Sequence, residues 1–162
     1  MRGKHSAIGI IALVAVLALT SVGVAAKAFP TRYTGVTSQG HPMRLAVGPT
    51  GRAVTVDMKY HYTCSPSNST IASGDKWRVY LASTRKFRDA WSMDQPQDIP
   101  DWPDLGTGDL KAVFKGSAYG QLGRTKAIGT YHEHVTILDA TGAPSQQCDT
   151  GTVRFSLKPA KK

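Results

Sequence analysis

The sequence is poor in glutamate: Glu133 is the single glutamate among its 11 acidic residues. A glutamate pair of the kind that many glycoside hydrolases use is therefore excluded, although an Asp–Glu or Asp–Asp pair is not. The nucleophile motif G-x-S-x-G is absent, because GVTSQG and GSAYG have a different spacing. No G-x-G-x-x-G or Walker sequence precedes a helical pattern, so a phosphate-cradling loop is not expected. These absences favour a protein that is not an enzyme and needs no cofactor.

Cysteine is also scarce, with only Cys64 and Cys148 and no C-x-x-C. This argues against a redox centre or a cysteine-based metal site. Cys64 ends an alternating stretch, and Cys148 stands before an Asp-Thr-Gly turn in QQCDTGTVRFSL. Two cysteines in an exported chain are most simply paired with each other. In the chain-entropy model, closing a loop of this length stabilises the fold by roughly 4–5 kcal/mol.

Export is indicated by the N-terminal segment MRGKHSAIGIIALVAVLALTSVGVAAKAFP. Arg2 and Lys4 precede an uncharged apolar run over residues 7–26, and Ala26-Lys27-Ala28 matches the A-x-A cleavage pattern. Residues 1–28 are therefore predicted to be a signal peptide, cut after Ala26 or after Ala28. The run of roughly 20 residues would span a bilayer if it stayed uncut, so an uncleaved anchor is the alternative. Either form places the protein outside the cell or at the envelope.

The remaining chain is the size of one domain. We expect a single β domain over residues 29–158 and a basic tail over 159–162. The whole chain carries a net charge of +9, of which Arg2 and Lys4 contribute two. Such a charge attracts anionic polymers. Nucleic acid is the least available of these outside the cytoplasm, so the expected partner is an anionic cell-wall polymer or another extracellular protein.

Period-two alternation recurs, whereas helical periodicity is hard to find. In RAVTVDMKYHYT, five apolar or aromatic side chains share one face, and Thr55, Asp57, Lys59 and His61 share the other. MRLAV, WRVYLAS, LKAVFKG, SAYGQLG, AIGTYHEHVTIL and TVRFSL continue the pattern between turns. We therefore predict an all-β fold, a small antiparallel sandwich or barrel of about eight strands with one disulfide.

One stretch interrupts this rhythm. Residues 89–109, DAWSMDQPQDIPDWPDLGTGD, hold three prolines, two tryptophans and six aspartates. Proline at this density excludes a helix or a central strand, so we expect a long surface excursion. Such a loop predicts either a calcium site or a solvated acidic segment. It is also suited to project from a secreted enzyme inhibitor. The calcium candidates are Asp98, Asp101, Asp104 and Asp109.

Four segments of the sequence carry a resemblance: the start YTGVTSQGHPMRLAV, the strand running into Cys64, the segment GQLGRTKAIGTYHEHVTI and the closing CDTGTVRFSL. Together they resemble a group of secreted bacterial β domains of the high-GC Gram-positive type. Members share a G-x-T-S-Q-G start, a late Gly-Thr strand and a closing C-D-x-G-T motif. The resemblance covers residues 33–157 apart from the excursion at 89–109. It implies an all-β fold and the disulfide, and no catalytic residue.

His132 and His134 form an H-x-H pair, which in a strand presents two imidazoles on the same side. His61, on the wet face of another strand, is a candidate third ligand. These residues predict a metal-binding protein or metal-dependent hydrolase, against the alternative of a solvated row that includes Thr130 and Thr136. Glu133 points to the opposite side.

A basic stripe with exposed Tyr80 and Tyr119 is the candidate site for an anionic glycan. Its residues are Lys111, Lys115, Arg124, Lys126 and Arg154. The preferred interpretation is an exported, non-catalytic β domain that acts by binding.

Overall fold

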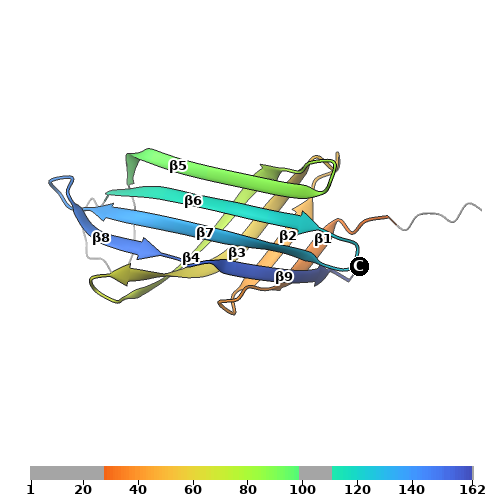
Figure 1. Ribbon diagram of the computed structural model, residues 1–162, viewed down its shortest axis with the longest axis horizontal. Helices are drawn as coiled ribbons and strands as arrows, with labels where there is room; N and C mark the ends of the chain where they lie inside the picture. The colour runs from red at the N-terminus through yellow and green to blue at the C-terminus, as the bar shows by residue number, and fades with distance from the viewer. Residues whose placement is uncertain (1–27, 99–110, 162) are drawn as a thin grey trace, which may run out of the picture.

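The computed structural model describes residues 28–98 and 111–161 and shows an all-β fold, as the alternation predicted (Figure 1). Nine strands are formed by these residues. They are β1 Arg32–Val36, β2 Pro42–Val47, β3 Ala53–Ser65, β4 Thr70–Tyr80, β5 Lys86–Asp98, β6 Lys111–Leu122, β7 Ala127–Leu138, β8 Pro144–Asp149 and β9 Val153–Pro159. The segments LKAVFKG and SAYGQLG join into one strand, β6, and all named pairings are antiparallel.

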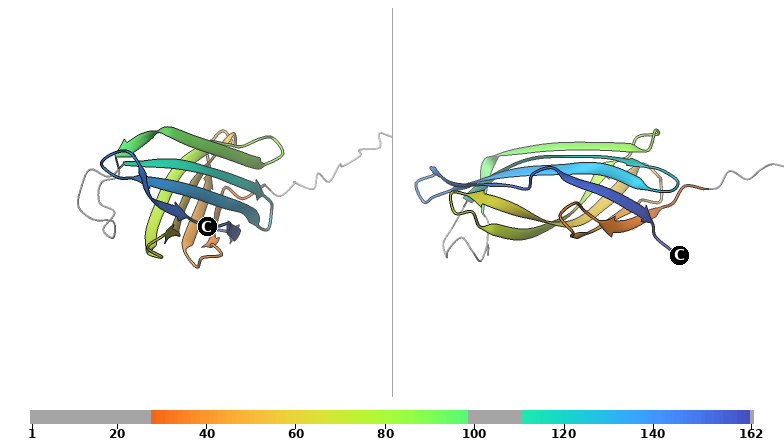
Figure 2. Two further views of the ribbon diagram at one scale, coloured as in Figure 1. Left: turned by 60° about the vertical axis from the view of Figure 1, so that its left-hand side comes forward. Right: turned by 60° about the horizontal axis from the view of Figure 1, so that its bottom comes forward.

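The strands follow the order β4-β3-β2-β1-β9-β7-β6-β5 and fold into two layers, which Figure 2 shows from two sides. On one side of the sandwich two connections join the layers: β1 pairs with β9, and further along the strands β8 pairs with both β3 and β7. The sandwich is therefore a ring, and this side of the ring is closed by hydrogen bonds.

The opposite side of the ring is open, because β4 and β5 are the two ends of the strand order. A tight turn joins these strands, and the single bridge between Leu81 and Phe87 holds them together next to it. Beyond the turn the two strand edges diverge. This geometry leaves an entrance to the interior between β4 and β5.

The predicted faces of the strands are confirmed. In β3 the side chains of Val54, Val56, Met58, Tyr60 and Tyr62 are buried in the core that both layers share. In β7 the outward row alternates with an inward row that is almost entirely buried. Burial of alternate apolar side chains is the main stabilising term of such a fold, at about 25 cal/mol per Å².

Glycines in β6 and β7 make room for aromatic rings of neighbouring strands. Gly120 and Gly129 lie opposite each other, with Phe87 paired to the first and Phe155 to the second. A Cβ added at Gly120 would lie 2.2 Å from the Phe87 ring. At Gly129 it would lie 2.3 Å from Phe155 and 2.1 Å from the Tyr119 carbonyl oxygen. Close packing across the strands therefore requires glycine at these positions.

The predicted disulfide is confirmed: Cys64 and Cys148 are bonded and stand directly opposite each other in β3 and β8. Both cysteines are buried. Cys148 was predicted only to precede a strand, whereas it lies inside a strand of its own, β8. A buried disulfide is compatible with an extracellular protein.

Two expectations about loops are corrected. Residues 89–98 do not belong to a surface excursion but form most of the edge strand β5, where Pro96 falls at an irregularity between Met93 and Gln97. An edge strand tolerates proline because one side of its backbone has no partner. The tail is also not free from residue 159 onwards, since Pro159 pairs with Tyr33 and the Ala160 N–H donates to the Arg32 carbonyl.

The predicted signal peptide lies outside the described residues, apart from its last position. In the two described ranges, no helix long and apolar enough to cross a membrane is found.

Candidate functional site

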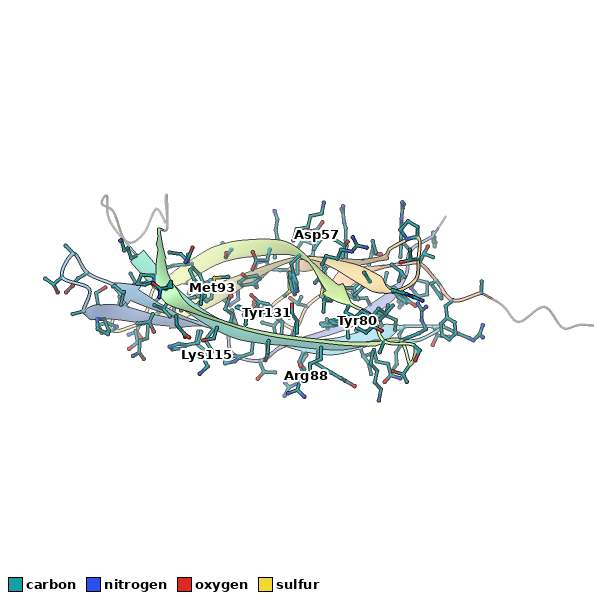
Figure 3. All side chains as sticks on the ribbon, turned by 90° about the horizontal axis from the view of Figure 1, so that it is seen from above. Asp57, Tyr80, Arg88, Met93, Lys115 and Tyr131 are labelled. Atoms are coloured by element: carbon teal, nitrogen blue, oxygen red, sulfur yellow. A yellow bond between two sulfur atoms is a disulfide. The ribbon has the colours of Figure 1, made fainter. Side chains whose placement is uncertain are left out.

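The open side of the ring leads into a pocket between the two layers. Figure 3 looks at this side, with Tyr131 and Met93 between the ribbons. The pocket has a volume of about 270 Å³, and a second one of about 290 Å³ adjoins it and shares three of its lining residues. We call the first the acid–aromatic pocket; it is lined by Asp75, Trp77, Asp89, Trp91, Met93 and Glu133.

Glu133 forms the floor of this pocket and is only 4% exposed. Its Oε1 accepts a hydrogen bond from Trp91 Nε1 at 2.8 Å. Its Oε2 accepts from the hydroxyls of Tyr131 at 2.7 Å, Tyr60 at 3.1 Å and Tyr62. An ionised carboxylate is an acceptor only, so a set made of donors alone satisfies it. Charge-assisted hydrogen bonds of this kind offset the cost of burying the charge.

The order of the strands brings these groups together. Trp91 in β5 stands opposite Gly116 in β6, and Gly116 stands opposite Glu133 in β7. The indole of Trp91 lies across Gly116 to reach the carboxylate, and a Cβ at Gly116 would be 2.3 Å from that ring. On the far side, Thr150 Oγ1 accepts from the Glu133 backbone N–H at 2.9 Å. Glu133 is thus held through its side chain by Trp91 of β5 and through its backbone by Thr150, which lies between β8 and β9.

A polar chain connects the floor to the entrance. The Tyr60 hydroxyl lies between two carboxylates, 2.8 Å from Asp75 Oδ2 and 3.1 Å from Glu133 Oε2, and its single proton is shared between them. Burial raises the pKa of Tyr60, Tyr62 and Tyr131, with the negative charge of Glu133 acting in the same direction. These tyrosines therefore remain neutral donors. Burial also raises the pKa of Asp75 above its ordinary 3.8, and the nearby Glu133 adds to this, although the Tyr60 hydroxyl opposes it.

Aromatic rings form the walls. The Trp77 and Trp91 ring centroids are 6.1 Å apart, and each lies 5.7 Å from that of Tyr131. Trp77 Nε1 is buried and has no hydrogen-bond partner within the described part of the chain. A buried N–H without a partner costs free energy, which a ligand with an acceptor oxygen would recover. The pocket thus combines three carboxylates with aromatic faces, and one of its lining residues, Trp77, carries a buried N–H that has no partner among the described residues.

A larger surface depression, about 610 Å³, is a different feature on the outer face of β7 and β9. Its lining includes the exposed apolar side chains Val36, Tyr119 and Ile128 and a single charged residue, Arg154. No carboxylate of the described residues lines it, whereas three carboxylates and two tryptophans converge on the smaller acid–aromatic pocket. Small-molecule sites combine an apolar lining with a few converging polar groups, so the interior pocket is the candidate site.

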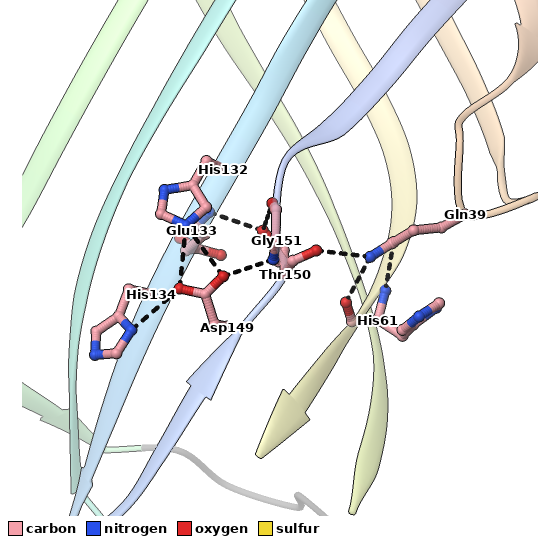
Figure 4. Close-up of polar contacts among 8 residues, drawn as sticks. All are labelled: Gln39, His61, His132, Glu133, His134, Asp149, Thr150 and Gly151. Atoms are coloured by element: carbon pink, nitrogen blue, oxygen red, sulfur yellow. Dashed lines mark hydrogen bonds and ion pairs between the residues drawn. The ribbon is translucent and has the colours of Figure 1, made fainter. Parts of the chain in front are cut away.

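The predicted metal ligands do not come together as a trio. His132 Nε2 lies 3.1 Å from both carboxylate oxygens of Asp149, and His134 Nδ1 lies 3.3 Å from Oδ2 (Figure 4). His61 instead contacts His41, with 3.1 Å between Nδ1 and Nε2. In the described residues, no group of three or more His, Cys, Asp or Glu side chains has a geometry that could hold a metal ion. The imidazoles belong to the outer surface.

Asp149 organises this outer pair of histidines. Partial burial opposes its ionisation, but the Gly151 N–H at 2.6 Å and the two imidazoles outweigh that effect and lower the pKa of the Asp149 carboxyl. The backbone contact belongs to the Asp-Thr-Gly segment between β8 and β9, which run in the same direction along β7, and Gly151 there has a φ of 60°. The cluster therefore has a structural use, tying the segment after β8 to β7.

The predicted basic stripe is divided between the ends of β6. Lys111 and Lys115 lie in one half of the strand, and Arg124 and Lys126 lie in the turn that follows its other end, about 35 Å from Lys111 at the usual rise per residue. Arg124 is engaged there, with its guanidinium 4.4 Å from the Phe29 ring. Arg154 lies apart on β9, opposite Thr130. The five residues do not make one surface.

The candidate calcium ligands Asp101, Asp104 and Asp109 lie outside the described residues, as does the side chain of Asp98. The calcium hypothesis stays a prediction.

The acid–aromatic pocket was not predicted from the sequence. Tyr60 and Tyr62 were predicted only to lie on an apolar face, and Glu133 only to point away from the histidines. The available signal was the one glutamate of the chain, placed on the inward row of β7 next to Tyr131. A charge in a buried row requires hydrogen-bonding partners, and tyrosines on other inward rows are suitable donors.

Comparison of the chain with protein families, with curated proteins and with solved structures finds no match.

Proposed function

We propose that this protein is an exported binding module that acts at or outside the cell envelope, and that the acid–aromatic pocket holds its ligand, a small organic ammonium cation that also carries an acceptor oxygen. The leader-like N-terminal segment and the buried disulfide support export. The observation that carries the ligand class is the convergence of Asp75, Asp89 and Glu133 with aromatic rings in one pocket.

The charge of the pocket opposes that of the molecule. The chain as a whole is positive, yet the charged residues that line this pocket are all carboxylates. Aromatic faces attract ammonium groups with about 0.5–2 kcal/mol per ring, and more strongly where water is excluded. Carboxylates next to such faces add Coulomb attraction, and Trp77 Nε1 offers a hydrogen bond to an oxygen of the same ligand. A volume of about 270 Å³ limits the ligand to a small molecule.

The state of Glu133 supports binding rather than catalysis. Both of its oxygens are engaged by Trp91 and three tyrosines, and the side chain is buried. A nucleophile or general acid needs an oxygen within reach of the reacting atom. Glu133 instead contributes a fixed negative potential beneath the pocket.

Titration with three probes tests the ligand class. Choline carries a charge and a hydroxyl, tetramethylammonium carries the charge alone, and 3,3-dimethylbutan-1-ol has the shape and hydroxyl of choline without the charge. We expect affinity to fall in that order, with at least a tenfold loss for the neutral compound. Calorimetry gives the affinities, and quenching of tryptophan fluorescence reports contact with Trp77 and Trp91. Equal affinity for choline and its neutral analogue would refute the proposal.

Two aspartates of β5 provide a matched pair of variants. Asp89 lines the pocket and is half-buried, whereas Asp94 is exposed on the opposite face of the same strand. Asp89→Asn should weaken choline binding at least fivefold, and Asp94→Asn, with the same change of net charge, should leave it within a factor of two. Similar losses in both variants would mean that net charge, and not the pocket, governs binding.

A further inference from the structure

The outer face of the layer opposite β6 and β7 concentrates positive charge. Two rows of residues cross β1 to β4 on this face, and the register of the strands places them side by side. The first row runs Thr34, Arg44, Asp57, Lys76, and Lys158 of β9 extends it next to Thr34. The second row runs Arg32, Ala46, Thr55, Arg78. We call the cations of both rows the basic sheet face; they are Arg32, Arg44, Lys76, Arg78 and Lys158.

These cations are exposed and lack acidic partners. In residues 28–98 and 111–161, the ion pairs within 4 Å are those of His132 and His134 with Asp149, and none involves a lysine or an arginine. Asp57, half-buried between Arg44 and Lys76, is the one carboxylate in the two rows. Five cations against one carboxylate leave the face strongly positive, with its guanidinium and ammonium groups free to bind anions.

The face is also hollowed. A depression of about 460 Å³ lies over β1 to β4, and its lining includes Arg32, Arg44, Lys76, Thr34 and Thr55. Threonine hydroxyls between the cations supply further hydrogen-bond donors. Adjacent strands are about 4.8 Å apart and alternate residues of a strand about 7 Å apart. The positive groups therefore repeat over distances that suit a chain of anions better than a single ion.

We infer that the basic sheet face is a second binding site, which docks the protein on a polymer with a phosphodiester backbone in the cell envelope. Guanidinium groups bind phosphate oxygens through paired N–H donors, and a row of them follows a chain of phosphates. The inference rests on the export that we propose but shares no residue with the acid–aromatic pocket. Its site also differs from the predicted stripe of Lys111, Lys115, Arg124, Lys126 and Arg154.

The opposite layer is less suited to this ligand. Its outer face also carries cations, namely Lys86, Arg88, Lys111, Lys115 and Arg154. It differs in holding Asp94, Asp149 with its two histidines, and the exposed apolar side chains of Tyr119 and Ile128. Its depression contains one cation only. Figure 3 shows Arg88 and Lys115 on one outer side of the molecule and Asp57, within the basic sheet face, on the other. The two sides therefore allow a matched comparison.

The probe is poly(glycerol phosphate). Its affinity for the full mature chain is measured by calorimetry at two salt concentrations. Arg44→Gln/Lys76→Gln should weaken binding at least tenfold. It should also reduce the magnitude of the slope of log K, the binding constant, against log salt concentration by about one to two. Arg88→Gln/Lys115→Gln removes the same charge from the other side and should change affinity less than twofold. Arg32→Gln/Arg78→Gln, in the second row, should repeat the first result and covers the case in which the first variant folds poorly.

Several results would overturn the inference. Equal losses on both sides would make net charge the cause, and affinity independent of salt would remove the electrostatic basis. Tenfold tighter binding of a single-stranded oligonucleotide would assign the face to nucleic acid instead. Choline titration of the same variants separates the two sites: choline binding that survives in Arg44→Gln/Lys76→Gln shows that a loss of polymer binding belongs to the face and not to a damaged pocket.

Discussion

At the scale of single residues, Glu133 determines the chemistry of the interior. A lone buried carboxylate is costly, but here an indole N–H and three phenol hydroxyls surround it. Asp75 belongs to the same network through Tyr60, yet it lies nearer to solvent at the entrance. The two acids therefore have different uses: Glu133 supplies a fixed charge, and Asp75 is the acid that a ligand can meet first.

Replacing Asp75 should raise stability while it lowers ligand affinity. Because the folded state raises the pKa of Asp75 above its ordinary 3.8, the folded protein binds the proton more tightly than the unfolded chain does. This contribution is complete below about pH 3.8 and is lost as the pH rises through the raised pKa. Asn cannot ionise, so the Asp75→Asn variant does not lose this stability as the pH rises. The melting temperature of the variant at pH 7 should therefore exceed that of the parent.

The pH profile supplies the check. Other acids contribute equally to both proteins, so the difference in melting temperature between Asp75→Asn and the parent should grow with pH above 3.8 and then level off. A difference that stays constant from pH 3 to pH 7 would show that the Asp75 carboxyl is not perturbed by folding. Choline affinity of the variant, measured at pH 7, should be lower than that of the parent, as expected where a strained binding group costs stability.

At the scale of elements, glycines in β6 and β7 decide how the strands pack. Gly116 lets the Trp91 indole reach Glu133, and Gly120 and Gly129 accept the rings of Phe87 and Phe155. These residues look unfavourable for a strand when taken singly, since glycine weakens strand interiors. The rings that cover them replace the missing side chains, so the cost of glycine is offset by aromatic burial.

Gly129→Ala should therefore destabilise the fold strongly, by about 3 kcal/mol or more, because the added Cβ meets the Tyr119 carbonyl oxygen and the Gly120 backbone as well as a ring. Gly35→Ala is the matched control. Its Cβ would meet a terminal methyl of Leu157 at 3.0 Å, which can shift, so we expect a cost below about 1 kcal/mol. Urea unfolding measures both, and similar costs would contradict the packing described.

At the scale of the whole molecule, the ring has a closed side and an open side. β8 and the Cys64–Cys148 bond join the two layers at the closed side, far from the entrance between β4 and β5. The acid–aromatic pocket and the basic sheet face consequently lie on separate surfaces. The proposed site for a small cation and the proposed site for a polyanion would therefore not overlap.

Removing the disulfide tests the closure. The bond joins residues 84 apart in sequence, so Cys64→Ala/Cys148→Ala should lower the free energy of unfolding by roughly 4–5 kcal/mol in the chain-entropy model. Guanidinium unfolding of the double variant measures this loss. A loss under about 1 kcal/mol would show that the pairing of β8 with β3 and β7 already holds the layers together without the bond.

Much of the fold was predictable because strand periodicity is local. The alternation in residues 53–63 and 127–138 correctly identified inward and outward faces, and the two cysteines correctly identified the disulfide. Local signals failed where an element depended on its partners. Residues 89–98 look like a loop because of Pro96, and they form a strand because an edge position leaves proline unopposed.

The sequence by itself determined the fold class, the faces of the main strands, the covalent link and the excess of positive charge, since composition and period two need no knowledge of distant contacts. Only the tertiary structure decided that Trp91, Gly116 and Glu133 form one row and that Arg44, Asp57 and Lys76 form another. Strand order and register join segments that are far apart in the chain. A binding site made from several strands is therefore a property of their pairing and cannot be found in any one of them.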